Sequence, residues 1–137
     1  MSSQICFLID DDEDDREIFA LALENANTDY SCITAKNGID AMEKINSAAV
    51  FAADFIFIDL NMPYMSGREC LEQIRNNPKT AGIPVIMYTT SSYSKDVEET
   101  KALGATYFLV KPPSLGALTT ALKNILHGTT LPFYLNA

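Results

Sequence analysis

The chain has 137 residues, of which 47% are hydrophobic and 20% are charged, and its formal net charge is −8. This length and composition predict one globular domain with a hydrophobic core. The acidic balance argues against direct binding to nucleic acid and against attraction to anionic membranes.

Three features of the sequence favour a cytoplasmic location. The N-terminal residues show no positive region followed by a long apolar stretch, and no apolar run reaches the length of a membrane span. The three cysteines, Cys6, Cys32 and Cys70, fit no zinc-ligand spacing, and their odd number argues against a disulfide framework. Because all three lie in apolar-rich segments, we expect buried free thiols in a reducing compartment.

The first predicted element is a strand over residues 5–9, a continuous run of apolar side chains. Six consecutive acidic residues, Asp10 to Asp15, follow it. Those from Asp12 to Asp15 suit the N-cap and first turn of a helix, where the helix dipole favours negative charge. This helix is expected to end near Asn25-Ala26-Asn27. Helix capping does not explain Asp10 and Asp11, which lie at the carboxyl end of the strand.

A short strand over residues 30–35, a turn at Asn37-Gly38 and a short helix around residues 41–45 are expected next. Residues 55–58 carry four bulky apolar side chains and predict a strand buried on both faces. This strand runs into Asp59, and Pro63 ends it because proline cannot donate to a strand ladder. A helix after Gly67 is expected to stop at the sequence Asn76-Asn77-Pro78.

A third apolar run, over residues 83–89, ends in the hydroxyl of Thr89. A polar, weakly patterned helix is predicted over residues 95–103, followed by a strand over 107–110 that ends in Lys111. An amphipathic helix over 115–126 stops at Gly128, and His127 is interpreted as a helix C-terminal residue rather than a phosphorylated histidine. The tail over 129–137 is expected to be irregular and to pack on the domain, and a role in an interface is the alternative.

Strands alternate with helices five times, which predicts a parallel sheet with helices on both faces and right-handed crossovers. Such a sheet would bring Asp10, Asp11, Asp59, Thr89 and Lys111 to one edge, where open α/β sheets place their ligand chemistry. Three converging carboxylates would repel one another unless a cation lay between them. Carboxylate oxygens without paired His or Cys favour Mg²⁺ over zinc. An ionised Asp beside Mg²⁺ and a lysine can attack phosphorus and form an aspartyl phosphate.

The chain resembles the receiver domain of two-component response regulators, and the resemblance extends to about Leu126. The matching segments are Leu8-Ile9-Asp10-Asp11, Asp59-Leu60-Asn61-Met62-Pro63 with Gly67 following, Val85-Ile86-Met87-Tyr88-Thr89 and Val110-Lys111-Pro112. The resemblance implies a flavodoxin-like, doubly wound, five-stranded parallel sheet of order 2-1-3-4-5. It divides the chain into a receiver domain over residues 1–128 and a C-terminal tail over 129–137.

The resemblance also implies the roles of the acidic residues. Asp59 would be the phosphoacceptor, and Asp10, Asp11, Asp59 and the backbone carbonyl of Asn61 would bind Mg²⁺. Asp11 would be the direct ligand of the acidic pair, with Asp10 acting mainly through water. The phosphoryl group would come from a sensor histidine kinase or a histidine phosphotransfer protein.

By the same resemblance, Thr89 and Lys111 would contact the phosphate, and Thr89 and Phe108 would form the switch. Three features depart from the family pattern: Thr90 stands where a smaller residue is usual, Pro113 stands where many receivers have an aromatic residue, and the chain extends past the last predicted helix. The expected function is a single-domain signalling switch that catalyses only its own phosphorylation and dephosphorylation. Its downstream protein is unknown, and homodimerisation stays open.

Two other functions share part of this pattern. A haloacid-dehalogenase-like phosphatase would use the same Asp59 nucleophile, but it typically carries a second Asp two residues later, where this chain has Asn61, and it needs a substrate-capping insertion. A phosphorylation-independent pseudo-receiver would not need the complete set of Asp10, Asp11, Asp59, Thr89 and Lys111.

Overall fold

The computed structural model describes residues 4–26, 29–128 and 130–136. Its elements in chain order are β1 (Gln4–Ile9), α1 (Glu13–Asn25), β2 (Tyr30–Ala35), α2 (Gly38–Ser47), β3 (Phe55–Ile58), α3 (Gly67–Asn76), β4 (Val85–Thr89), α4 (Ser94–Ala102), β5 (Tyr107–Val110), α5 (Leu115–Leu126) and β6 (Tyr134–Asn136). The expected order of strands and helices is confirmed as far as α5. The expectations that touch residues 1–3, Asn27, Thr129 and Ala137 lie outside the described residues.

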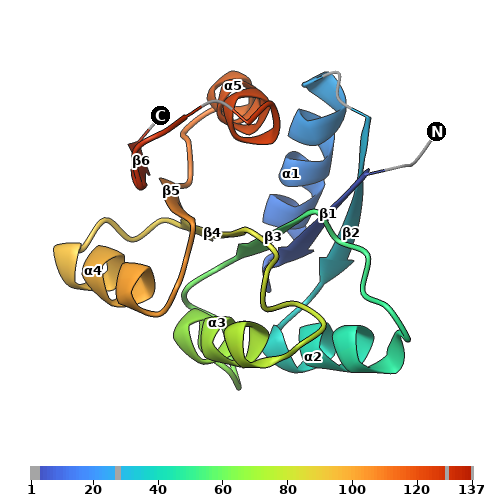
Figure 1. Cartoon of the computed structure of the whole chain (residues 1–137). Coiled ribbons are helices and arrows are strands. Elements are labelled where there is room, and N and C mark those ends of the chain that lie inside the picture. Colours follow the sequence, from blue (N-terminus) through green and yellow to red (C-terminus); the bar gives the residue numbers. More distant parts are fainter. Residues whose placement is uncertain (1–3, 27–28, 129, 137) are drawn as a thin grey trace.

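The sheet is wholly parallel and has six strands in the order β2-β1-β3-β4-β5-β6. The predicted order of the first five strands is confirmed, but the predicted count of five is wrong, and the tail is not wholly irregular. β6 lies beside β5 after the chain returns from α5 (Figure 1). A strand of three residues is too short to show a periodic pattern, so its pairing with β5 depends on tertiary contacts.

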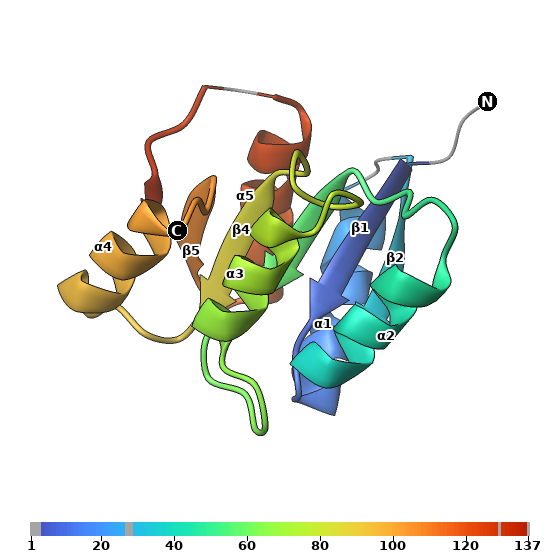
Figure 2. The same cartoon turned by 60° about the horizontal axis from the view of Figure 1, so that its bottom comes forward.

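The helices cover both faces of the sheet, with α1 and α5 on one side and α2 and α3 on the other (Figures 1 and 2). The position of β1 between the two layers of helices explains why its sequence is continuously apolar. Cys6 and Leu8 belong to the core cluster that contains residues of α1 and α5, whereas Phe7 and Ile9 belong to the cluster with residues of α2 and α3. Side chains alternate between the two faces along a strand. When both faces are covered, none of the positions faces solvent, so all of them are apolar.

Side-chain caps fix where four helices begin. Asp12, Asn37 and Ser114 each accept a hydrogen bond from a backbone N–H in the first turn of α1, α2 and α5. Ser66 and Glu69 form a reciprocal capping box at the start of α3. These caps satisfy N–H groups that have no partner within the helix.

The helix α4 lacks a side-chain cap, and Thr100 is its buried residue. Charged groups connect it to α3: Arg68 forms ion pairs with Asp96 and with Glu99, the latter at 2.6 Å between Nε and Oε2. The weakly patterned helix expected here is therefore present, and polar contacts supply much of its attachment.

Two of the three cysteines follow the sequence expectation. Cys6 and Cys70 are buried, whereas Cys32 is only half-buried, so the prediction of burial is wrong for Cys32. Its strand β2 lies at the edge of the sheet, where burial alternates along the strand. His127 is the C-cap residue of α5, as expected. Over the described ranges, none of the helices combines the length and the apolar character that crossing a bilayer requires.

Candidate functional site

The carboxyl ends of the central strands bring together the polar residues singled out in the sequence. The backbone N–H of Asp59, just after β3, donates to the carbonyl of Ile9 at the end of β1. The backbone N–H of Lys111, just after β5, donates to the carbonyl of Thr89 at the end of β4 over 2.7 Å. These bonds continue the parallel ladders one residue beyond the strands and hold the site residues in register.

Three carboxylates converge at this edge. One oxygen from each of Asp10, Asp11 and Asp59 lies within 4.8 Å of the others. Asp10 and Asp59 are buried, and Asp11 is exposed, so the cluster opens to solvent on one side. A set of carboxylate oxygens with one open side fits a hard divalent cation that keeps part of its water shell.

Lys111 is the cation that borders this cluster. Its Nζ lies 2.9 Å from Asp10 Oδ2 and 3.7 Å from Asp59 Oδ2, and it also lies 5.1 Å from the centroid of the Tyr88 ring. A third carboxylate, Asp15 Oδ2, lies nearest, at 2.7 Å. The predicted proximity of Lys111 to the carboxylates is therefore present in the structure.

Sequence reasoning missed Asp15, which it assigned only to the first turn of α1. The signal that could have found it is its spacing to Phe19, because residues four apart lie on the same side of a helix. Phe19 is fully buried against the sheet. Arg16 was also missed: its Nη1 donates to the backbone carbonyl of Asp10 over 2.7 Å and holds the segment between β1 and α1.

The ionisation of the site follows from burial and from these neighbours. Burial raises the pKa of Asp59 to about 7, with the charge of Asp10 adding to the rise, while Lys111 and the backbone N–H of Asn61 oppose it. Burial also raises the pKa of Asp10. Burial alone would lower the pKa of Lys111, but hydrogen bonds to Asp15 and Asp10 outweigh it and raise the pKa, so the ammonium stays charged.

The two expected switch residues lie in the core. Thr89 is fully buried, and its Oγ1 accepts a hydrogen bond of 3.2 Å from the backbone N–H of Ser91. Phe108 is also fully buried, three residues before Lys111, and its ring stacks on Tyr134 of β6. Thr90 and Pro113, the two single residues that depart from the family pattern, are both exposed.

Gly67 lets α3 begin directly against the backbone of the site. Its N–H donates to the carbonyl of Leu60 over 2.8 Å. A Cβ at this position would lie 2.4 Å from the carbonyl oxygen of Asp59 and 2.6 Å from the Cα of Leu60. Because both of these are backbone atoms, only glycine permits this approach.

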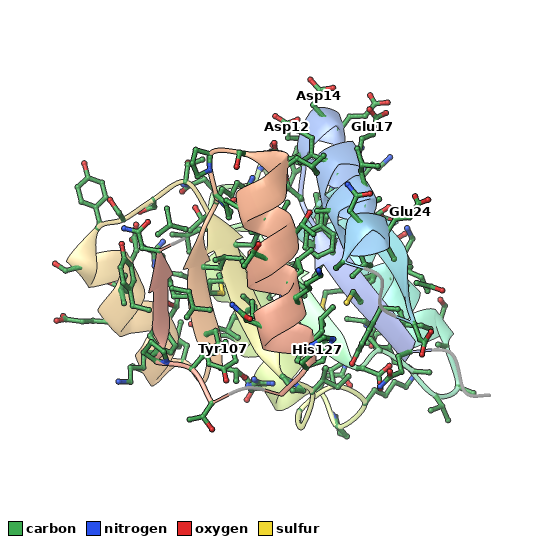
Figure 3. The ribbon with its side chains drawn as sticks, turned by 90° about the horizontal axis from the view of Figure 1, so that it is seen from above. Asp12, Asp14, Glu17, Glu24, Tyr107 and His127 are labelled. Carbon is green, nitrogen blue, oxygen red and sulfur yellow. The ribbon has the colours of Figure 1, made fainter. Side chains whose placement is uncertain are left out.

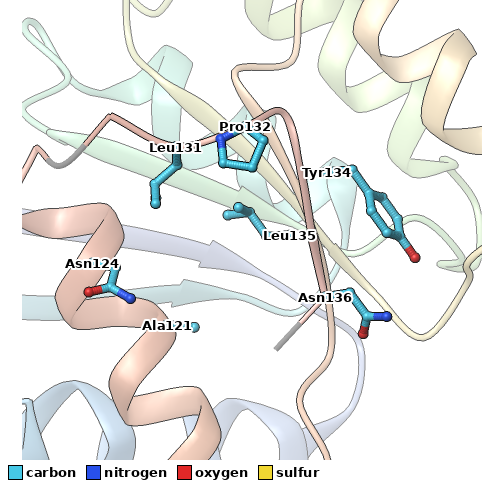
Figure 4. Close-up of a pocket in the computed structure, with 7 residues that line it drawn as sticks. All are labelled: Ala121, Asn124, Leu131, Pro132, Tyr134, Leu135 and Asn136. Atoms are coloured by element: carbon cyan, nitrogen blue, oxygen red, sulfur yellow. The ribbon is translucent and has the colours of Figure 1, made fainter.

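A separate pocket of about 290 Å³ lies between α5 and the tail (Figure 4). Its lining residues are Ala121, Asn124, Leu131, Pro132, Tyr134, Leu135 and Asn136. No carboxylate, lysine or histidine is among them, so this pocket lacks the acidic and basic groups that meet at the strand ends.

Fold and site together define a class of protein. A doubly wound parallel sheet carries a cluster of three carboxylates, two of them buried, and a half-buried lysine at the carboxyl ends of its strands, an arrangement suited to phosphoryl chemistry. The sequence pattern of the response regulator receiver domain matches residues 6–123. The chain belongs to this family, whose members act in two-component signalling.

Three relatives show how the chain compares with known proteins. Response regulator Rcp1 of Synechocystis sp. is 28% identical over 137 residues, which cover 94% of this chain and 93% of Rcp1. The structure of its Mn²⁺-bound form superposes with a TM-score of 0.80 at 28% identity, covering 94% of this chain and 99% of that one. The phosphorylated cyanobacterial phytochrome response regulator RcpA has a TM-score of 0.84 at 29% identity, with 96% of this chain and 99% of that chain covered.

The third relative is a longer protein. A probable cyclic di-GMP phosphodiesterase of Vibrio cholerae is 35% identical over 124 residues, which cover 90% of this chain but only 27% of the relative. The similarity is therefore confined to about a quarter of that protein and gives no reason to assign its activity to this chain.

Proposed function

We propose that this chain accepts a phosphoryl group on Asp59 from a phosphohistidine of a sensor kinase or a histidine phosphotransfer protein. The observation that carries the proposal is the position of Lys111 Nζ, 2.9 Å from Asp10 and 3.7 Å from Asp59, beside the three-carboxylate cluster. A carboxylate next to both a cation site and a lysine can act as a nucleophile toward phosphorus.

In the proposed transfer, an ionised Oδ of Asp59 forms a bond to phosphorus. The bond between phosphorus and the donor imidazole nitrogen breaks, and its electron pair stays on that nitrogen. Lys111 then lies beside the phosphoryl oxygens and balances their charge. The Thr89 hydroxyl would donate a hydrogen bond to one of them, and it would then no longer be held by Ser91.

The residues that would hold Mg²⁺ are Asp10, Asp11, Asp59 and the carbonyl of Asn61. The ion would supply positive charge to the phosphoryl oxygens and keep Asp59 ionised. Burial raises the pKa values of Asp10 and Asp59 because it disfavours their ionised forms. A divalent cation beside them would stabilise the ionised carboxylates, and this attraction would favour its binding.

The signal would leave the domain by protein contact, through a phosphorylation-dependent rearrangement of Thr89 and Phe108. We take residues 1–128 as the receiver domain and 129–137 as a tail whose described part adds β6 to the sheet. The free thiols of Cys6, Cys32 and Cys70 fit a reducing compartment and support a cytoplasmic location.

Phosphorylation with acetyl phosphate and Mg²⁺ tests the acceptor. Intact-mass measurement should show one added phosphate, which acid removes, and Asp59→Asn should abolish it. Asp14→Asn is the matched control, because Asp14 is exposed and projects outward at the N-terminal end of α1 (Figure 3). Equal labelling of Asp59→Asn would contradict the proposal. An unlabelled parent would favour a receiver that binds partners without phosphorylation.

Thermal unfolding tests the metal site. Mg²⁺ should raise the melting temperature of the parent, because it binds the folded chain preferentially. Asp11→Ala should weaken this effect and slow phosphorylation, whereas Asp14→Ala should change both much less. Asp11 is exposed, so the substitution leaves the core intact. Undiminished Mg²⁺ affinity in Asp11→Ala would remove Asp11 from the ligand set.

A further inference from the structure

Asp15 is the carboxylate closest to Lys111, yet it is not part of the three-carboxylate cluster. Its Oδ2 lies 2.7 Å from Lys111 Nζ, compared with 2.9 Å for Asp10 and 3.7 Å for Asp59. The ammonium therefore donates hydrogen bonds to Asp15 and Asp10, and Asp59 lies beyond hydrogen-bond distance.

The two carboxylates that bind Lys111 differ in their surroundings. The Asp10 side chain is fully buried, and its Oδ1 also accepts the backbone N–H of Asp12. The Asp15 side chain is 33% exposed and lies on the first turn of α1. When the Lys111 contact breaks, water can solvate Asp15 but not Asp10. Asp15 is therefore the partner that Lys111 can leave at the smaller cost.

We propose that Asp15 is a positioning residue that holds Lys111 away from Asp59 until a phosphoryl group arrives. The inference rests on the proposed function, since it concerns the same transfer to Asp59. The oxygens of a phosphoryl group on Asp59 would bring new negative charge next to Lys111, and a lysine nitrogen that moves toward them would give up its contact with Asp15. The Asp15–Lys111 pair then acts as a restraint on transfer, and removing it should speed phosphorylation.

The phosphorylation rate with acetyl phosphate at saturating Mg²⁺ tests this restraint. Asp15→Asn should accelerate labelling about threefold, the ratio expected for releasing a partly exposed ion pair. Asp15→Glu, which keeps the charge, should retain a rate close to the parent's. Asp14→Asn removes the same charge one residue away without a contact to Lys111 and should change the rate less than Asp15→Asn does. Asp15→Ser provides a second neutral variant, should Asp15→Asn fold poorly.

A double-mutant cycle separates positioning from simple charge removal. In a Lys111→Met background, Asp15→Asn should have no further effect on the rate, because its action passes through the lysine. In the unphosphorylated chain, the side-chain Cε–Hε NMR signal of Lys111 should shift in Asp15→Asn and stay in place in Asp14→Asn.

The outcomes distinguish this inference from the proposed function. If the parent is labelled and Asp15→Asn is labelled at the same rate, or if the acceleration persists without Lys111, only the role of Asp15 is overturned. An unchanged Lys111 signal in Asp15→Asn also overturns it. If the parent takes no phosphate at all, the proposed function fails, and the restraint fails with it.

Discussion

The ring of Tyr134 on β6 stacks against the ring of Phe108 on β5, with centroids 6.1 Å apart and planes inclined by 25°. The two residues are also register partners in the parallel ladder between these strands. Phe108 is fully buried, whereas Tyr134 is 38% exposed. The sixth strand therefore covers the aromatic residue to which the proposed switch assigns a movement, and it adds a contact that a five-stranded sheet would lack.

Replacing Tyr134 should reveal how much this contact stabilises the domain. We expect Tyr134→Ala to lower the free energy of unfolding by about 1–2 kcal/mol, because it removes an aromatic stack and part of a buried ring. Urea unfolding followed by far-UV circular dichroism measures the loss. Tyr93→Ala is the control, since that ring is 77% exposed. Equal stability of the two variants would show that β6 contributes little to the fold.

Gly67 offers a sharper test of how α3 supports the site. Gly67→Ala should cost about 2–3 kcal/mol or more, because the new methyl group would overlap backbone atoms of Asp59 and Leu60. It should also slow phosphorylation by displacing Asp59. Gly116→Ala is the matched control: no heavy atom lies within 4 Å of its added Cβ, and alanine favours the helix. A Gly67→Ala protein as stable as the parent would contradict the close approach seen here.

Most of the fold could be predicted because strands, four of them continuously apolar, alternate with helices, of which all but α4 have a side-chain cap. The site followed from the same pattern, since Asp59 and Lys111 each end a strand and parallel strands end at one edge. β6 could not be predicted, because three residues carry no periodic signal and their pairing arises only once α5 returns the chain to β5.

The role of Asp15 was hidden for a different reason. Six consecutive acidic residues all fit a strand end or a helix start, so the acidic block alone does not show that Asp15, besides Asp10, reaches Lys111. That contact depends on the rotation of α1 about its axis, which burial of Phe19 sets. The partial exposure of Cys32 was likewise decided by the place of β2 at the sheet edge.

The raised pKa of Asp59 predicts an unusual pH dependence of stability in the metal-free protein. Its folded pKa of about 7 lies above the ordinary value of 3.8, so between these limits the folded chain binds more protons than the unfolded chain. The contribution of protonated Asp59 to the free energy of unfolding is complete at low pH and is lost as the pH rises through about 7. Near the middle of this range, Asp59 should lower the free energy of unfolding by up to about 1.4 kcal/mol per pH unit.

Asp10, whose pKa is also raised, adds to the same slope. Asp59→Asn should remove the part due to Asp59, and Asp14→Asn should retain it. Urea unfolding in EDTA across pH 4 to 8 measures the difference between the parent and each variant. Mg²⁺ should reduce the slope in the parent, because it favours the ionised carboxylates. A constant difference between the parent and Asp59→Asn at every pH would contradict the raised pKa.

The switch itself is the last prediction. In the unphosphorylated chain, the Thr89 hydroxyl accepts a hydrogen bond from the Ser91 N–H. Phosphate on Asp59 should draw the hydroxyl away from this donor. Ser91 in turn donates its hydroxyl to Asp96 of α4 over 2.5 Å, and Asp96 pairs with Arg68 of α3. Hydrogen bonds therefore connect Thr89 through Ser91 to α4, and few apolar side chains hold this helix on the domain. Phosphorylation can bias this route only by interacting differently with its two arrangements.

Beryllofluoride, a phosphoryl mimic, allows the switch to be followed by NMR of the Phe108 ring and of the α4 backbone. In the parent, both should change when the mimic binds with Mg²⁺. Thr89→Ala should still bind the mimic at Asp59 but transmit a smaller change, whereas Thr90→Ala, altered at an exposed neighbour, should respond like the parent. If α4 shifts while the Phe108 signal stays fixed, the stack on Tyr134 holds the ring in place and the output passes through Ser91 and Asp96 alone. If neither moves in the activated parent, Thr89 and Phe108 are not the switch, and the loops after β3 and β4 become the output surface to test.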